Sequence, residues 1–530
     1  MDLNSILMIL VGIVLFIFGI ENFSSEIQRS ASSLLNKILK KATENKWLGA
    51  FYGFLTTALV NSSTATTLMA VSLVNAGFIS FVHSLPLIFG ANIGSTITAQ
   101  LVAFKITSYA SIFLIFGFLL SFFRKTKFLG KSIFYFGLIF FSLDLISFVI
   151  SPLSKDPRTL EVFSMFKNFY ALLFLGFIFT LIFNSSALTI GIIIVLASKG
   201  FFSLENSFPL ILGANLGTTI STLIASIRMD LYARRLAFAH FLFNFLGVIL
   251  ILPFINPFLR IIPLFGGGIE RQIANAHFLF NVLAAIVFLL FLKPFKRFVE
   301  ILVRGKEEEI LLSSKFISEE VPKENKEAFS LVEKEIKNFI ETDKKILFYS
   351  KEFLSTGNEK YLRKVEKLLY LSNVLNEMIG KFLFSFSIRK LNEKEAKKIL
   401  YLVRISNSLE QLGDFCGDFA FLPDKLKQKN LKDNFNFRSI KSFFNKFDFV
   451  FDKLIECFPK KISSEEVTFL HSKKIVSFIN EQYSFHSKNL EKEDFSAGSF
   501  FVEAVSITES LLFKIRELFL LCEEYSKIRE

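Results

Sequence analysis

The feature that most limits the fold of this chain is a duplicated segment that carries polar residues into apolar sequence. The first copy runs from Asn61 to Thr98 and the second from Asn184 to Ser221, at a constant separation of 123 residues. Each copy opens on Asn-Ser-Ser and closes on Gly-Ala-Asn-x-Gly followed by two hydroxyl residues. Chance does not keep such a register, so the sequence predicts two equivalent structural units.

The sequence around both copies is strongly apolar. Hydrophobic residues make up 52% of the 530 residues, and no Asp, Glu, Lys or Arg occurs from Phe51 to Phe104. Beyond Gly305, charged residues come every few positions. The chain is too apolar for an ordinary soluble protein, and its length is too great for one domain. We therefore predict a transmembrane domain over residues 1–304 and a polar domain over residues 305–530.

The net charge of +13 arises almost entirely before Arg304, where basic residues cluster between apolar runs. This placement is typical of loops that fix membrane topology, and it argues against a nucleic-acid partner. The positive-inside rule puts the N-terminus outside the cell membrane and the polar domain in the cytoplasm. Cys416, Cys457 and Cys522 lack metal-site spacing, so we expect small buried side chains in a reducing compartment.

Hydropathy and length predict two hairpins and seven spans in an all-α, polytopic membrane protein. The spans are 3–20, 82–104, 109–123, 132–150, 207–227, 236–252 and 273–292, and the re-entrant hairpins are 47–75 and 169–198. Glycines within 82–104 indicate a broken helix. Repeat 1 (about 1–123) then makes three crossings, so repeat 2 (about 124–246) enters in the opposite direction, and extra helices occupy 247–304.

Two polar turns facing each other would line a pocket at mid-membrane. Its predicted lining is Asn61, Ser62, Ser63, Thr64, Asn184, Ser185 and Ser186. Hydroxyls donate to oxyanions, half-helix starts add positive dipole, and oxygen atoms can ligate Na⁺. The first turn has no Lys or Arg, so a co-transported cation would supply the positive charge. The alternative is that these hydroxyl runs only bridge helices.

Two further motifs leave more than one interpretation open. The run Ala-His-Phe-Leu-Phe-Asn places His240 and Asn244 four residues apart, and it recurs with His277 and Asn281. We expect these residues to pack or hydrogen-bond between helices rather than to contact the substrate. Glu21 and Asp144 occupy equivalent places near span ends and either mark an ion path or lie at the interface.

The polar domain shows six amphipathic helices in two sets of three, which we interpret as a cytoplasmic helical bundle. The predicted links are 355–357, 390–392, 423–436, 459–461 and 491–498. Glu410, Asp414 and Asp418 share one helix face. A ladder of carboxylates repels itself unless a cation neutralises it, so it is either a solvated acidic face or a metal site.

At the duplicated motifs the chain resembles the sodium/phosphate cotransporter family, the type II group with its bacterial members. That family carries a Gln-Ser-Ser-Ser turn in each of two inverted repeats, each followed by a GANIGTT-like segment. The resemblance implies Na⁺-coupled symport of inorganic phosphate by alternating access, with Ser62, Ser63, Ser185 and Ser186 at the phosphate. It implies Na⁺ or substrate contacts from Thr66, Asn92, Ser95, Thr96, Thr189, Asn215, Thr218 and Thr219.

The chain departs from that pattern at four positions. Asn61 and Asn184 replace Gln, Thr64 replaces the third Ser, and Ala187 removes a hydroxyl. We therefore keep two alternatives, a symporter for another small anion and a membrane-anchored sensor without transport. No arrangement of nucleophile, base and acid points to an enzyme.

The polar half resembles a PhoU domain. That resemblance implies regulation of uptake or sensing of phosphate, and it implies a divalent cation or iron at Glu410, Asp414 and Asp418. We also expect a homodimer in the lipid membrane.

Overall fold

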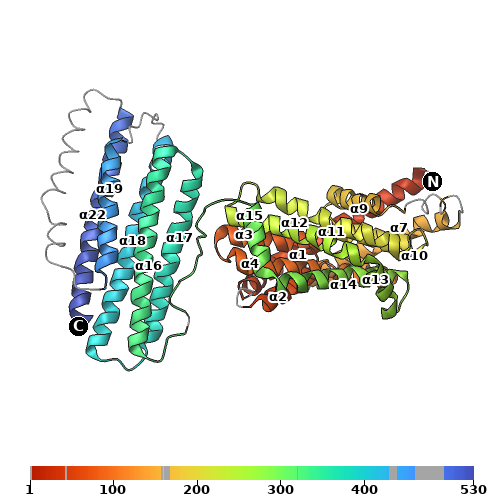
Figure 1. Cartoon of the computed structure of the whole chain (residues 1–530), viewed down its shortest axis with the longest axis horizontal. Helices are drawn as coiled ribbons and strands as arrows, with labels where there is room; N and C mark the ends of the chain where they lie inside the picture. Colours follow the sequence, from red (N-terminus) through yellow and green to blue (C-terminus); the bar gives the residue numbers. More distant parts are fainter. Residues whose placement is uncertain are drawn as a thin grey trace. The chain divides into compact units, whose positions relative to one another are not determined.

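The computed structural model is helical in the parts of the chain that it describes, which are residues 3–41, 45–104, 106–156, 159, 161, 167–318, 320–428, 438–459 and 495–529 (Figure 1). No strand occurs in these ranges, which confirms the all-α prediction. The chain divides into two compact units, Met1–Glu309 (unit 1) and Ile310–Glu530 (unit 2). Each unit is described by itself.

Unit 1 holds the helices of the apolar half. They are α1 (Leu3–Lys41), α2 (Lys46–Val60), α3 (Ser63–Ala76), α4 (Phe81–Gly94), α5 (Ile97–Ala103), α6 (Ala110–Ser121), α7 (Lys127–Ile150), α9 (Phe169–Phe183), α10 (Ser186–Ser198), α11 (Leu204–Ser226), α12 (Leu231–Ile251), α13 (Ile255–Ile261), α14 (Ile269–Leu290) and α15 (Leu292–Leu302). Short 3₁₀ turns lie at Ile106–Tyr109, Ser151–Lys155, Leu252–Phe254 and Ile262–Phe265.

Among the described residues, six helical segments are long and apolar enough to cross a membrane. They are Leu3–Arg29, Phe81–Ala103, Lys127–Lys155, Leu204–Ser226, Leu231–Phe265 and Ile269–Leu290. The seventh predicted crossing, 109–123, is wrong as a full span, because α6 has 12 residues. At 1.5 Å per residue it reaches about 18 Å, well short of the hydrocarbon core.

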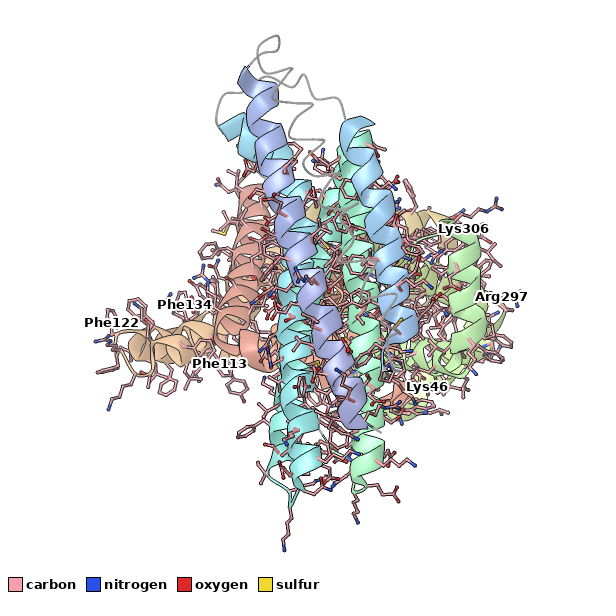
Figure 2. All side chains as sticks on the ribbon, turned by 90° about the vertical axis from the view of Figure 1, so that its left-hand side faces the viewer. Lys46, Phe113, Phe122, Phe134, Arg297 and Lys306 are labelled. Carbon is pink, nitrogen blue, oxygen red and sulfur yellow. The ribbon has the colours of Figure 1, made fainter. Side chains whose placement is uncertain are left out.

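The α6–α7 hairpin is held by close backbone approach and carries phenylalanines on its outer side. A Cβ atom on Gly117 would lie 2.3 Å from the backbone nitrogen of Phe134. Figure 2 shows Phe113, Phe122 and Phe134 projecting from this hairpin, and Phe122 is 70% exposed. Exposed aromatic side chains at this density suit contact with lipid.

The breaks in the two hairpins lie where the polar turns predicted them. α2 ends at Val60 and α3 begins at Ser63, while α9 ends at Phe183 and α10 begins at Ser186. The predicted break in the following helix is also present in the first copy, where Ser95 and Thr96 separate α4 from α5. The second copy differs, because α11 runs unbroken through the equivalent residues.

Glycines allow the first half of each hairpin to pack closely against the helix that carries the Gly-Ala-Asn run. A Cβ atom on Gly90 would lie 1.8 Å from the carbonyl oxygen of Ala50, and one on Gly213 would lie 1.9 Å from that of Leu173. These four positions correspond at the 123-residue separation. The duplication therefore extends to the packing of α2 on α4 and of α9 on α11.

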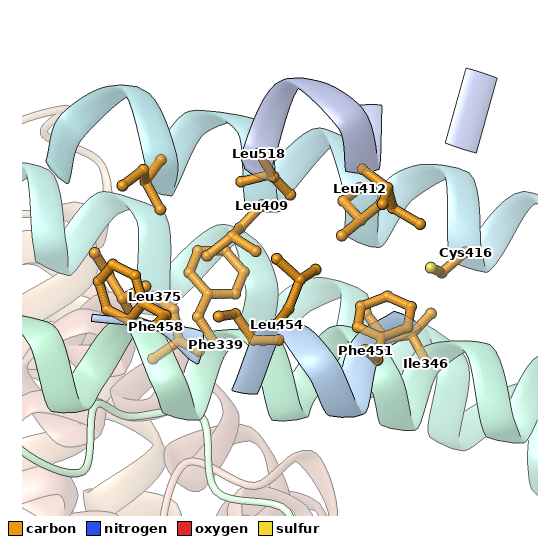
Figure 3. Close-up of a cluster of buried hydrophobic side chains, with 14 of the residues drawn as sticks. Phe339, Ile346, Leu375, Leu409, Leu412, Cys416, Phe451, Leu454, Phe458 and Leu518 are labelled. Atoms are coloured by element: carbon orange, nitrogen blue, oxygen red, sulfur yellow. The ribbon is translucent and has the colours of Figure 1, made fainter. Parts of the chain in front are cut away.

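Unit 2 is a bundle of long amphipathic helices. They are α16 (Asn325–Thr356), α17 (Glu359–Ser387), α18 (Glu393–Gln428), α19 (Arg438–Cys457) and α22 (Phe495–Arg529). Figure 3 shows their shared apolar core, in which Phe339, Leu375, Leu409, Leu454 and Leu518 pack together. The three cysteines are free and buried, as predicted.

In unit 2, two predicted links differ in their bounds from the structure, and a third lies mostly outside the described residues. α18 continues through Pro423 to Gln428, so the predicted link 423–436 begins too early. α22 begins at Phe495, so the predicted link 491–498 ends too late. The fifth predicted helix and most of the link 459–461 lie outside the described residues. Pro423 within α18 costs the helix one backbone hydrogen bond, and packing of the bundle's core offsets that loss.

Candidate functional site

Both polar turns adopt the same unusual backbone conformation. Asn61 has φ 56° and ψ 29°, and Asn184 has φ 50° and ψ 30°. They are the two non-glycine residues with positive φ in the described parts of the chain. Asparagine tolerates this left-handed conformation better than other residues with a side chain, since its short amide bonds locally. Asparagine at these positions therefore suits the tight turn that ends each half-helix.

The side chain of each turn asparagine is bonded to the segment after the Gly-Ala-Asn run. The Asn61 Oδ1 atom accepts a hydrogen bond from the Thr98 hydroxyl, and the Asn184 Oδ1 atom accepts one from the Ser221 hydroxyl. Thr98 and Ser221 are themselves equivalent at the 123-residue separation. These bonds tie each turn to its partner helix, a role that the sequence analysis did not assign to either residue.

The serine after each asparagine caps the second half-helix. Ser62 Oγ accepts a hydrogen bond from the Ala65 N–H at 3.2 Å, and Ser185 Oγ accepts one from the Leu188 N–H at 3.2 Å. An N-cap of this kind is a standard helix start. The hydroxyl proton of each serine remains available to donate, and the neighbouring N–H groups at the helix start favour a negative charge.

One cavity of about 290 Å³ is lined by both turns. Its lining consists of Ile17, Ile20, Glu21, Ser24, Ser25, Gln28, Asn61, Ser62, Ser63, Thr64, Ala65, Leu68, Ser95, Phe183, Asn184, Ser185, Ser186, Ala187 and Thr218. The set includes all seven residues predicted to line the pocket. The size lies near the lower end of the range for small-molecule sites, ~300–1,000 Å³. The structure thus brings together two turns that are far apart in the sequence.

The predicted sodium residues divide into two groups. Ser95 and Thr218 line the cavity, whereas six others are not among its lining residues: Thr66, Asn92, Thr96, Thr189, Asn215 and Thr219. Each hydroxyl in the second group bonds to a backbone carbonyl three or four residues earlier, and that of Thr189 also meets a hydroxyl on α9. The Thr180 and Thr189 hydroxyls lie 2.6 Å apart. A role of these residues in Na⁺ binding stays a prediction.

Helix α1 supplies part of the lining that the sequence analysis did not include. Glu21, Ser24, Ser25 and Gln28, here named the α1 stripe, all line the cavity. Their spacing of i, i+3, i+4 and i+7 places them on one helix face. Asp144, which corresponds to Glu21 in the second copy, is not among the lining residues.

The small His-Asn repeat contacts the duplicated motif. The Asn244 Nδ2 atom on α12 donates to Asn92 Oδ1 at 3.1 Å. On α14, Asn281 Oδ1 accepts from Asn215 Nδ2 at 3.4 Å, and His277 Nε2 lies 3.1 Å from Asn215 Oδ1. Each asparagine of a Gly-Ala-Asn run thus meets one copy of the His-Asn repeat. The prediction that these residues bond between helices is confirmed for Asn244, His277 and Asn281, whereas His240 is buried without a hydrogen-bond partner among the described residues.

The charge of the cavity is unusual for an anion site. Among the described residues that line it, Glu21 is the one carboxylate, and none is Lys, Arg or His. The donors available to an anion are neutral hydroxyls, amides and backbone N–H groups at helix starts. A site of this kind binds an anion weakly unless a cation accompanies it.

The predicted metal residues of unit 2 lie along α18. Burial raises the pKa of Asp414, and the charges of Glu410 and Asp418 raise it further. Glu410 accepts a hydrogen bond from the Asn376 amide. Within the described residues no group of three or more His, Cys, Asp or Glu side chains is arranged to hold a metal ion. The metal site therefore stays a prediction.

Comparison with known proteins identifies the apolar half of the chain. The Na⁺/Pi-cotransporter family matches residues 15–147 and 158–254. YqeW of Bacillus subtilis is 30% identical over 247 residues, which cover 46% of this chain and 80% of that protein. No solved structure matches the chain significantly.

Other relatives have names that state a substrate. The Salmonella typhimurium protein named a putative inorganic phosphate export protein, YjbB, is 27% identical over 257 residues, 48% of this chain and 47% of that protein. The match thus spans about half of the exporter's length. Mouse sodium-dependent phosphate transport protein 2C is 35% identical over 100 residues, 18% of this chain and 16% of that protein. On the family match and the coverage of YqeW, the chain belongs to the Na⁺/Pi-cotransporter family.

Proposed function

We propose that this protein carries inorganic phosphate across the cell membrane, coupled to Na⁺, and that the cavity between the two Asn-Ser-Ser turns is the phosphate site. The observation that carries the proposal is that both turns line one cavity. The names of two relatives support phosphate as the substrate, and one of these names also supports sodium dependence.

The chemistry of the cavity suits a phosphate that is bound and then released. Ser62 and Ser185 each present a hydroxyl at the start of a half-helix, where the N–H groups favour an anion. The lining residues that the structure describes carry no fixed positive charge to hold the anion tightly. Na⁺ would then supply charge only while it is bound, which links the two solutes.

We further propose that the two repeats are inverted and that alternating access moves this cavity from one side to the other. The equal turn geometry and equal glycine contacts of the copies support a duplicated unit. The excess of basic residues in alternate loops supports an N-terminus outside and unit 2 in the cytoplasm. We expect the protein to form a homodimer in the membrane.

The direction of transport has two candidates. The name of the Salmonella relative favours export, whereas the resemblance to type II cotransporters favours uptake. Uptake and efflux of radiolabelled phosphate in proteoliposomes, each with an imposed Na⁺ gradient, distinguish the two directions. The double variant Ser62→Ala, Ser185→Ala should lose both uptake and efflux.

Three outcomes would contradict the proposal. Wild-type protein that is folded and inactive beside working controls would favour a membrane-anchored sensor. Transport that sulfate or a dicarboxylate inhibits better than phosphate would favour another anion. Transport that is equal in Na⁺ and in choline would remove the sodium coupling.

For unit 2 we propose a regulatory domain that resembles PhoU and binds a divalent cation or iron through Glu410, Asp414 and Asp418. The raised pKa of Asp414 beside two carboxylates supports a place where a cation would relieve repulsion. Metal analysis of the purified protein, wild type against Asp414→Asn, tests this. Equal metal content in the two proteins would contradict the proposal.

A further inference from the structure

The carboxylate of Glu21 is unexplained by the fold around it. Two neighbours on α1 have structural partners: Asn22 donates to the carbonyl oxygen of Phe18 at 2.8 Å, and Glu26 forms an ion pair with Lys131 at 3.0 Å. Glu21 forms no hydrogen bond or ion pair with any described residue, and it lines the cavity. Glu21 is exposed, and among the described residues it is neither a helix cap nor half of an ion pair.

A bare carboxylate beside an anion site is unfavourable by itself. The negative charges of Glu21 and a bound phosphate repel each other, and the described lining residues include no basic side chain to separate them. A cation between the two removes the repulsion and attracts both. Acidic residues within membrane-spanning segments that face a cavity commonly mark ion paths.

The α1 stripe also supplies neutral ligands of the type that Na⁺ prefers. Ser24 and Ser25 bring hydroxyl oxygens one turn after Glu21. Gln28 Nε2 donates to Ser24 Oγ at 3.0 Å, so the carbonyl oxygen of Gln28 is left to bind a cation. One charged oxygen and several neutral ones on a single helix face form a suitable partial shell for a hard monovalent cation.

We propose that Glu21 is a ligand of the coupling cation, which binds on the α1 stripe between this carboxylate and the anion held by the two turns. The inference rests on the proposed function and deepens it, because it assigns one Na⁺ to a helix outside the duplicated motif. It also explains how a cavity without basic residues binds phosphate only when the cation is present.

The first experiment measures equilibrium binding of phosphate to purified full-length protein in NaCl, KCl and choline chloride at one ionic strength. We expect Na⁺ to strengthen binding to the wild type. Glu21→Gln should show two changes together: phosphate binds more tightly than to wild type in choline, because the repulsion is gone, and Na⁺ no longer strengthens binding. A merely damaged protein would bind more weakly in both salts.

The second experiment measures phosphate transport against Na⁺ concentration in proteoliposomes. Loss of a charged ligand should raise the half-saturating Na⁺ concentration of Glu21→Gln by roughly tenfold or more. Glu21→Asp keeps the charge on a shorter side chain, so its half-saturating Na⁺ concentration should lie between those of wild type and Glu21→Gln. Glu26→Gln is the matched control, a carboxylate on the same helix that does not line the cavity, and its Na⁺ dependence should equal that of wild type.

The outcomes separate the two proposals. Folded Glu21→Gln with wild-type dependence on Na⁺, in binding or in transport, would overturn the role of Glu21 and leave phosphate transport intact. Binding that KCl strengthens as well as NaCl, in wild type alone, would overturn Na⁺ as the cation. Wild-type protein that neither binds nor transports phosphate would instead overturn the proposed function.

Discussion

The two copies of the duplicated motif have nearly the same local structure and different surroundings. Asn61 and Asn184 share one backbone conformation and equivalent hydrogen bonds, and the glycine contacts behind them correspond pair by pair. The cavity, however, includes the α1 stripe, which lies before the first copy, and none of its described lining residues comes from around Asp144. Local sequence therefore determines the turns, whereas helices outside the motif make the site asymmetric.

That asymmetry has a direct meaning for transport. A symmetric pair of turns offers equivalent groups to an anion from both sides. On the proposed function, the carboxylate of Glu21 on one side would give the coupling cation one place to bind. The predictions below test where the copies are equivalent and where they differ, beginning with the largest expected effect.

The glycine contacts should be equally essential in both copies. Gly90→Val and Gly213→Val each force a side chain into a backbone carbonyl that lies less than 2 Å from the Cβ position. We expect both variants to lose folded protein, as measured by monodispersity in size-exclusion chromatography and by thermal unfolding. Gly247→Ala is the control, because its Cβ would make an ordinary contact of 3.4 Å with Phe280.

The turn asparagines should also behave alike. Asn61→Gln and Asn184→Gln place a residue that disfavours positive φ in each turn and disturb the bond to Thr98 or Ser221. Strain and lost hydrogen bond together cost about 2–3 kcal/mol. If that cost falls on the binding-competent turn, phosphate affinity drops roughly 30-fold or more.

Two controls separate the causes of that loss. Asn61→Gly keeps the backbone conformation and removes only the side-chain bond, and Thr98→Val removes the same bond from the other side. Both should lose about tenfold or less, as expected for one hydrogen bond of ~1 kcal/mol. A Gln variant no weaker than these controls would show that the left-handed conformation is unimportant.

Sequence alone was sufficient for the turns and insufficient for the α1 stripe, for a physical reason. A run such as Asn61 to Thr64 interrupts apolar sequence, so its effect is local and visible. The polar residues after Ile20 look like the end of a span, because hydropathy falls there. They become one face of a site only because α1 continues as a helix to Lys41. The length of α6 escaped prediction for a similar reason, since hydropathy measures apolar content and not where a helix ends.

Unit 2 offers a contrast between two buried carboxylates. Glu335 accepts three backbone N–H groups, from Lys315, Phe316 and Ile317 at 2.9, 2.6 and 3.3 Å. Asp343 is fully buried, and its oxygens have no hydrogen-bond partner among the described residues. Burial raises the pKa of Asp343 well above its usual value, and the Asp414 charge raises it further. The fold therefore stabilises the charged form of Glu335, whereas burying the charged form of Asp343 costs free energy of folding.

That contrast predicts opposite effects of two similar variants on unfolding. Because the folded pKa of Asp343 is raised, stability is full below the unfolded value of about 3.9 and falls as pH rises towards the folded value. Asp343→Asn removes this loss, so it should stabilise the protein by about 1–3 kcal/mol at pH 7 and by little at pH 4. Glu335→Gln should destabilise it at pH 7. A destabilised Asp343→Asn in thermal unfolding at pH 7 would contradict the prediction.

The hydroxyl that distinguishes the two turns should be measurable. Thr64 lines the cavity, and its counterpart Ala187 has no donor. Thr64→Ala should weaken phosphate binding by about tenfold or less, the range for one hydrogen bond. Ala187→Thr should leave binding unchanged or strengthen it. Equal binding by wild type and Thr64→Ala would show that the two turns are already equivalent towards the anion.

The smallest difference concerns the two buried histidines. His277 Nε2 contacts Asn215, whereas neither ring nitrogen of His240 has a hydrogen-bond partner in the described protein. Removing a satisfied polar group leaves its partner unpaired, while removing an unsatisfied one does not. His277→Phe should therefore lower the unfolding temperature more than His240→Phe, by an amount equivalent to about 1 kcal/mol. Equal shifts would mean that the second copy of the His-Asn repeat is no more tightly coupled to its Gly-Ala-Asn partner than the first.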